Sequence, residues 1–139
     1  MAVTSGTQGK HVVSTASKLQ YVVLAVGEAC AYLAILRFRG FGGVRAWVRD
    51  TAVASGAPQR DLKIHVAVIE RTLDCLPRNV RCLGRAAVFT RILRRHSVPA
   101  QMKIGVRVAP FFAHAWVVSD RQVFGFAEDL TQFTVIDQV

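Results

Sequence analysis

The sequence has few cysteines and no pattern of metal ligands. Its 139 residues include three cysteines, Cys30, Cys75 and Cys82, and no C-x-x-C pair. An odd number of cysteines without paired spacing argues against a disulfide framework and against a zinc site, and it favours a reducing cytoplasm. We therefore expect a cytoplasmic protein with no metal and no cofactor.

Acidic residues are also scarce. The chain has 9 Asp and Glu against 18 Lys and Arg, a formal net charge of +9 at pH 7. A basic surface of this kind favours polyanions or acidic peptides. The basic residues are spread along the chain instead of forming a stripe with interleaved aromatic residues, so we do not expect nucleic acid as a partner.

The amino terminus has no apolar run. Residues 1–17 are mostly small and polar, which excludes a secretory signal and predicts a loosely ordered terminus. The segment from Tyr21 to Phe38 is strongly apolar, but it is slightly short for a membrane span and carries Glu28 in its middle. We predict a buried or one-sided helix with Cys30 in the core, and no stable membrane insertion.

The rest of the chain predicts helices first and a sheet afterwards. The glycines at 40, 42 and 43 should end the first helix. Arginines at the end of the last helix suit its dipole and are expected to be solvated. The predicted helices span 21–38, 44–54, 60–73 and 82–96, and the predicted strands span 101–108, 113–118, 122–126 and 133–136. With no repeat or linker, this is one α+β domain over 18–139.

Two residues carry chemistry in this arrangement. Cys82 opens a predicted helix, where the dipole and the free N–H groups of the first turn lower the pKa of a thiol. His114 lies on a predicted strand about thirty residues later, within reach of the thiol if the helix packs on the sheet. A thiol beside an imidazole is a nucleophile with its base, which predicts a cysteine protease.

The stretches around these residues resemble a known family. Cys82-Leu83-Gly84-Arg85, residues 92–100, Ile104-Gly105-Val106-Arg107 and residues 112–117 are similar to the leader peptidases of lasso-peptide biosynthesis. Those enzymes are compact members of the papain-like, transglutaminase-core superfamily. The resemblance covers 82–123 closely and the helical amino-terminal half loosely, and it implies a nucleophile helix packed on an antiparallel sheet.

The resemblance also implies a reaction and partners. Such enzymes remove the leader from a ribosomally made precursor peptide, and a macrolactam synthetase related to asparagine synthetases then closes the ring. A small winged-helix protein often captures the leader. The first eighty residues here read as the protease's own helices, so we expect the split form, in which the recognition protein is a separate chain. The cut is expected after a leader whose second-to-last residue is threonine.

The chain departs from the family pattern at three positions. Ser97 replaces a turn glycine, Ala86 replaces a serine, and Phe126 stands where the family has its third catalytic residue, an acid twelve positions after the histidine. Asp120, at the predicted turn, is our choice to orient His114, with Glu128 as the runner-up. Asp129, a backbone carbonyl and a Cys–His pair with no orienting group stay open as alternatives.

Two other functions remain open. The chain is alternatively a catalytically weakened scaffold of the same fold, or a transglutaminase or amidase that acts on another amide. Trp116, two residues after the histidine on the same strand face, is open between shielding the Cys–His contact, lining a peptide groove and core packing. Phe111 and Phe112 likewise either form a leader-binding pocket or fill the core.

Overall fold

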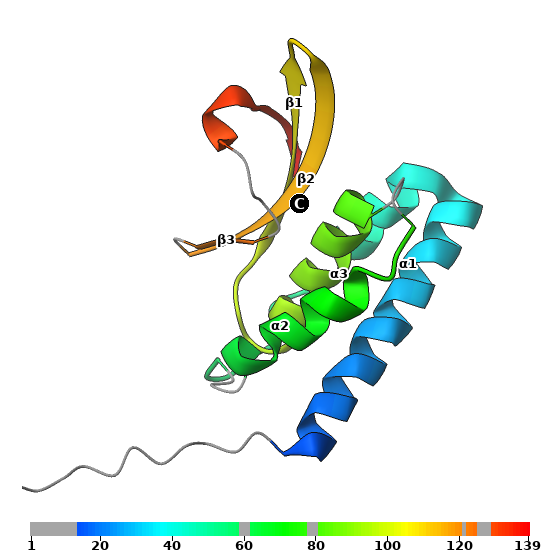
Figure 1. The fold of residues 1–139 in the computed structure, drawn as a ribbon, viewed down its shortest axis with the longest axis vertical. Helices are drawn as coiled ribbons and strands as arrows, with labels where there is room; N and C mark the ends of the chain where they lie inside the picture. The colour runs from blue at the N-terminus through cyan, green and yellow to red at the C-terminus, as the bar shows by residue number, and fades with distance from the viewer. Residues whose placement is uncertain (1–13, 59–61, 78–80, 121, 125–128) are drawn as a thin grey trace, which may run out of the picture.

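The fold places three helices on one side of a four-stranded antiparallel sheet (Figure 1). A computed structural model describes residues 14–58, 62–77, 81–120, 122–124 and 129–139. The elements are α1 (Thr15–Arg49), α2 (Leu62–Leu73), α3 (Arg81–Arg95), β1 (Gln101–Val108), β2 (Phe111–Ser119), β3 (Gln122–Phe124), the 3-10 helix η2 (Leu130–Gln132) and β4 (Thr134–Gln138). The predicted α+β class is confirmed.

Helix α1 is bent into two arms at Gly40. The backbone there has φ 62° and ψ −163°, a conformation that glycine reaches without the steric cost of a side chain. The chain was predicted to break at these glycines, and it does, although the second arm ends at Arg49 instead of Ala54. The first arm begins at Thr15, capped by the Ser14 hydroxyl, so it extends into the segment that was expected to be loosely ordered.

The bend returns the second arm of α1 to the domain. Arg45 donates two hydrogen bonds to the Asp137 carboxylate on β4, at 2.7 and 2.9 Å. The Arg91 guanidinium of α3 lies 3.9 Å from the centroid of the Trp47 ring, a cation–π contact. These contacts join the second arm of α1 to β4 and to α3.

Helix α3 is the centre of the molecule, between α1 and the sheet (Figure 1). Its residues from Ala86 to Arg94 are all buried, and the predicted inward face of Ala86, Phe89, Ile92 and Leu93 is confirmed. The buried residues that complete the core come from all layers: Tyr21, Ala25, Tyr32, Val44, Val48, Ile69, Leu73, Leu76, Met102, Ala115 and Val117. The position of α3 therefore depends on α1, α2, β1 and β2.

The carboxyl end of α3 differs from the prediction of a solvated end. Arg91 and Arg94 are buried, with 8% and 9% of their surface exposed. Arg91 donates to the Glu28 carboxylate at 2.8 Å, and Arg94 donates to the carbonyl oxygens of Val48 and Ala100, both at 2.8 Å. Arginine fits here because its five donors serve several acceptors at once.

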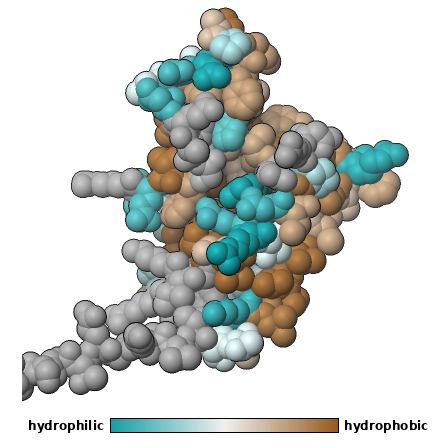
Figure 2. All heavy atoms as spheres, in the orientation of Figure 1, coloured by the Kyte–Doolittle hydropathy of each residue, from teal (hydrophilic) through white to brown (hydrophobic). Residues whose placement is uncertain are grey.

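Glu28 explains how a charge is accommodated inside the apolar helix α1. Its carboxylate is buried and pairs with both Arg91 and Arg95 of α3. The helix is long and apolar enough to cross a membrane by length and composition alone. The face of α1 that carries Glu28, however, packs against α3 of the same domain. The opposite face is exposed, and the prediction of Cys30 in the core was wrong. Brown spheres at the lower right of Figure 2 mark that apolar face.

The sheet has the order β3-β2-β1-β4. Strands β1 and β2 form a long hairpin in which Gly105 lies opposite His114 and Val108 lies opposite Phe111. Strand β2 begins two residues before its predicted start, and Phe133 precedes β4.

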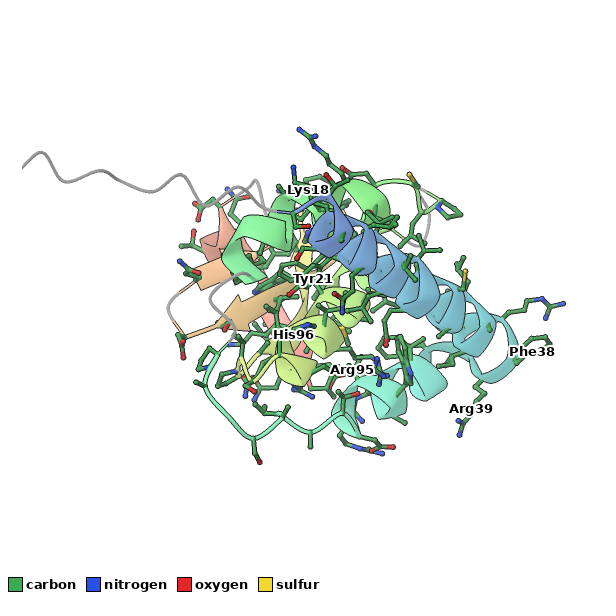
Figure 3. All side chains as sticks on the ribbon, turned by 90° about the horizontal axis from the view of Figure 1, so that it is seen from below. Lys18, Tyr21, Phe38, Arg39, Arg95 and His96 are labelled. Atoms are coloured by element: carbon green, nitrogen blue, oxygen red, sulfur yellow. The ribbon has the colours of Figure 1, made fainter. Side chains whose placement is uncertain are left out.

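Ser97, which replaces the family's turn glycine, has a φ of 63°, a conformation that explains why glycine is usual there. Tyr21 of α1 packs on the adjacent His96 ring, at 5.4 Å (Figure 3).

Candidate active site

Cys82 is the second residue of α3. The first turn of a helix leaves its backbone N–H groups without intrahelical partners, and the N–H of Leu83 is directed at the Cys82 sulfur. Gly84 holds this turn close to α1, because a Cβ at that position would lie 2.7 Å from the Tyr32 ring and 3.0 Å from Leu76. The helix start is thus pressed against the core while the thiol faces the sheet.

His114 comes from β2 and meets the thiol. A hydrogen bond with the His114 imidazole is the largest cause that lowers the pKa of Cys82 below its ordinary value. The charge of the imidazolium and the N–H groups of Ala115 and Leu83 lower this pKa further, while burial raises it. The two residues chosen from the sequence are therefore brought together, and the imidazole stabilises the thiolate relative to that of an ordinary cysteine.

The pair lies in the wall of a cavity of about 580 Å³ between α3 and β2. This volume falls in the range of small-molecule and peptide side-chain sites. The walls are mainly apolar, with charged groups from Glu70 and Arg85 and the following residues: Leu73, Cys82, Ala86, Phe89, Phe112, Ala113, His114, Ala115, Trp116, Val117 and Phe124. A substrate group in this cavity would touch both sulfur and imidazole.

Aromatic rings surround the imidazole. The Phe112 ring is stacked on it at a centroid distance of 6.0 Å, and the Phe133 ring lies 6.4 Å away. Trp116 is buried, lines the cavity and contacts Phe133 edge-on at 6.2 Å. Trp116 is therefore packed against Phe133 and also lines the cavity beside Cys82 and His114.

Gly105 makes room for this cluster. A Cβ there would lie 2.6 Å from the indole ring of Trp116 and 3.2 Å from the carbonyl oxygen of Thr134. The Ile104-Gly105-Val106 stretch thus has a structural reason for its glycine, since only a hydrogen fits beneath the indole. The ring cluster fixes the strand that carries His114.

Arg85, the last residue of the Cys82-Leu83-Gly84-Arg85 motif, joins α3 to α2. Its guanidinium lies 2.5 Å from the Asp74 carboxylate and 3.9 Å from that of Glu70. These partly exposed ion pairs stabilise the domain modestly, but they orient the first turn of α3 at the mouth of the cavity. The motif therefore combines the cavity-lining thiol with the arginine that orients its helix.

The structure does not bring Asp120 to His114. Asp120 lies in the turn between β2 and β3, beside the paired residues Ser119 and Gln122, with a φ of 50°. It lines a different cavity, with Arg94 and Pro99. His114 lies within β2, and Asp120 follows the end of that strand six residues later, a span of roughly 20 Å along an extended chain. The structure gives no contact that supports Asp120 as the orienting acid.

The runner-up Glu128, and Phe126 at the position of the expected acid, lie outside the described residues. Two neighbours of the site were not selected from the sequence. Tyr32 lies beneath the first turn of α3, where burial and the nearby Cys82 charge raise the pKa of its phenol to about 12. Phe133 lies against the imidazole. Neither belongs to a motif, so only tertiary packing identifies them.

In the parts of the chain that the structure describes, no three His, Cys, Asp or Glu side chains gather closely enough to hold a metal ion. The chemistry of the described site is that of its thiol, imidazole and backbone N–H groups. A thiolate at a helix start beside an imidazole is suited to attack on a carbonyl carbon.

Comparison with known families agrees with this geometry. Residues 23–138 match the family model of the Transglutaminase-like superfamily. The chain belongs to this superfamily. Its members are typically cysteine-dependent proteases or acyltransferases. No curated protein and no solved structure matches the chain. The superfamily match includes α2, α3 and the sheet, and therefore both Cys82 and His114.

Proposed function

We propose that this transglutaminase-like protein is a cytoplasmic cysteine protease that removes the leader from a ribosomally made lasso-peptide precursor. The observation that carries the chemistry is the hydrogen bond between Cys82 and His114, which lowers the pKa of the thiol in the wall of the cavity. The lasso-specific part rests on the sequence resemblance from Cys82 to Val123.

In the proposed reaction, the Cys82 thiolate attacks the carbonyl carbon of the scissile amide while His114 carries the proton. The carbonyl oxygen becomes an oxyanion, for which the backbone N–H groups directed at the sulfur are suitable donors. The imidazolium then donates its proton to the leaving amine. The C–N bond breaks, which leaves a thioester on Cys82 and releases the amino-terminal amine of the second fragment.

Hydrolysis of the thioester completes the cycle. His114 accepts a proton from water, the resulting hydroxide adds to the thioester carbonyl, and the C–S bond breaks to release the carboxylate of the leader. The thiolate and the imidazolium are thereby restored. A transglutaminase would differ only in this second half, where an amine replaces water as the attacking group.

The proposal includes three partners. The substrate is the precursor peptide, and a separate winged-helix protein holds its leader. An asparagine-synthetase-like macrolactam synthetase consumes the freed amine. The high positive charge of the chain is suited to acidic groups on the leader or on the recognition protein. The rate of leader cleavage should then fall as the salt concentration rises. If the rate does not depend on salt, the positive charge has no role in binding the leader or the recognition protein.

The decisive experiment uses a precursor peptide encoded beside this reading frame, with and without the neighbouring winged-helix protein. Mass measurement of the products should show two fragments whose masses sum to the precursor plus one water. The variant Cys82→Ala should give neither fragment, while Cys30→Ala and Cys75→Ala, which change exposed cysteines, should cleave normally.

The same experiment separates the alternatives. Amide transfer is the second candidate, favoured by the superfamily match. It would join the whole precursor to an added amine with loss of ammonia from a side-chain amide, or join one fragment to the amine with loss of the other fragment. A scaffold would support processing by its partners equally well with Ala at position 82. Either result, or selective alkylation at Cys30 or Cys75 in place of Cys82, would overturn the protease proposal.

A further inference from the structure

The tip of the β1–β2 hairpin exposes large apolar side chains. Val108 is 80% exposed and Phe111 is 75% exposed, and the two lie opposite each other in the strand register. Figure 2 shows tan and brown spheres at the top of the molecule, where this tip lies. Apolar groups gathered on a surface usually mark a place where another molecule binds.

This tip is continuous with the active site. Phe112, the next residue along β2, is 45% exposed, lines the cavity with Cys82 and stacks on the His114 ring. The Arg107 guanidinium lies 5.8 Å from the centroid of the Phe112 ring and 5.5 Å from that of Phe133. Phe112 points to the face of β2 opposite that of Phe111, whereas Ala113 shares the face of Phe111 and also lines the cavity with Cys82. The apolar surface therefore runs from the hairpin tip, across Ala113, to the cavity wall.

From this continuity we infer that Val108 and Phe111 form an exosite for an apolar side chain of the peptide substrate. The inference rests on the proposed function, because the occupant is the peptide that Cys82 cleaves. Three residues of strand separate Phe111 from His114, about 10 Å. An extended peptide rises by a similar amount per residue, so the side chain at the exosite belongs about three to four residues from the scissile amide.

A peptide fits this surface better than a folded partner does. The patch is a narrow hairpin end, and the cavity beside it is sized for side chains. A peptide anchored at the tip would lie along β2 with its scissile amide near the thiol. Anchoring at a distance positions the amide for attack, so the exosite should affect KM more than kcat.

The test compares Val108→Ser and Phe111→Ser with Phe38→Ser. Phe38 is 82% exposed and points away from the domain at the far end of the first arm of α1 (Figure 3), so it controls for the loss of an exposed apolar side chain. On a peptide that spans the leader–core junction, each exosite variant should raise KM about tenfold with little change in kcat. Phe38→Ser should behave as wild type.

Substrate changes locate the occupant. Replacement of apolar residues by serine, three to four positions before or after the scissile amide, should raise KM on one side only. That effect should be absent in Phe111→Ser, because the two changes remove the same contact. A short amide without this extension should be cleaved equally by all variants. The exosite is wrong if the exosite variants lose activity equally on the short amide, or keep the wild-type KM on the long one.

Binding measurements separate this inference from the proposed function. In a Cys82→Ala background, a fluorescent junction peptide should bind with a Kd about tenfold weaker when Phe111→Ser is added. If wild type cleaves no precursor but the peptide binds in this Phe111-dependent way, the protease proposal fails and the exosite stands. If cleavage is normal and the Kd is unchanged in Val108→Ser and in Phe111→Ser, the exosite inference fails and the protease proposal stands.

Discussion

The polar groups at the two ends of α3 have different surroundings and different roles. At the amino end, Cys82 faces a cavity, and backbone N–H groups are directed at its sulfur. At the carboxyl end, Arg91 and Arg94 are buried, and their donors are bonded to a carboxylate and to carbonyl oxygens of α1 and the loop before β1. The polar groups at the amino end of α3 face a cavity that a substrate can enter. The polar groups at the carboxyl end bind other parts of the fold.

This contrast shows what each kind of group is suited to do. Removing a partner of a buried arginine is costly, because it leaves a buried charge without its counterpart. A thiol with an imidazole beside it contributes little to packing, and its lowered pKa makes it reactive. Changes at the amino end should therefore alter chemistry, and changes at the carboxyl end should alter stability.

The largest expected effect is that of His114→Ala on chemistry. Loss of the general base should lower kcat/KM by about 10²–10⁴-fold. Because the imidazole is the main cause of the lowered pKa of Cys82, its removal should shift that pKa upward, and the pH midpoint of iodoacetamide labelling at Cys82 should rise. Peptide mapping isolates Cys82 from the exposed Cys30 and Cys75. If the midpoint of labelling stays at the wild-type pH, His114 does not lower the pKa of Cys82, and the amino end of α3 has no special chemistry.

At the other end, Glu28→Ala should cost about 3–5 kcal/mol of unfolding free energy, since it leaves Arg91 buried without its carboxylate. Urea unfolding measures this change. Asp50→Ala is the matched control, because its pair with Arg49 is exposed and should cost under about 1 kcal/mol. Equal effects of the two changes would show that the buried network does not hold α3.

Gly84→Ala should have an intermediate effect. The added methyl would meet the Tyr32 ring at 2.7 Å, and overpacking of this kind costs about 1–3 kcal/mol, more than alanine gains in helix propensity. Thermal unfolding should show a lower Tm. Gly27→Ala, where nothing lies within 4 Å of the new Cβ, should instead raise the Tm. If both changes raised it, α3 would not be pressed against α1 at Cys82.

The smallest effect is expected for Asp120→Asn. Its carboxylate lies in the turn at the far end of β2 and lines a different cavity from His114. The kcat/KM on a precursor peptide should stay within about twofold of wild type, well below the 10²–10⁴-fold loss of a catalytic acid or base. A loss of that size would restore Asp120 as the orienting acid.

Sequence reasoning succeeded where the pattern is local. The helices over 60–73 and 82–96 and the strand over 101–108 were predicted within one or two residues, because apolar period and turn residues act over a few positions. It failed where the outcome depends on distant elements. Cys30 looked like a core residue, but the bend at Gly40 and the Glu28 network turn the other face of α1 inward.

By itself, the sequence determined the order of helices and strands and placed a thiol at a helix start and an imidazole on a strand. Those features follow from backbone periodicity and capping, which neighbouring residues decide. Only the tertiary structure decided that the thiol and imidazole meet, that Asp120 lies elsewhere, and that arginines end up buried. Such facts depend on packing between segments far apart in the chain, because burial and pKa are properties of the assembled surroundings.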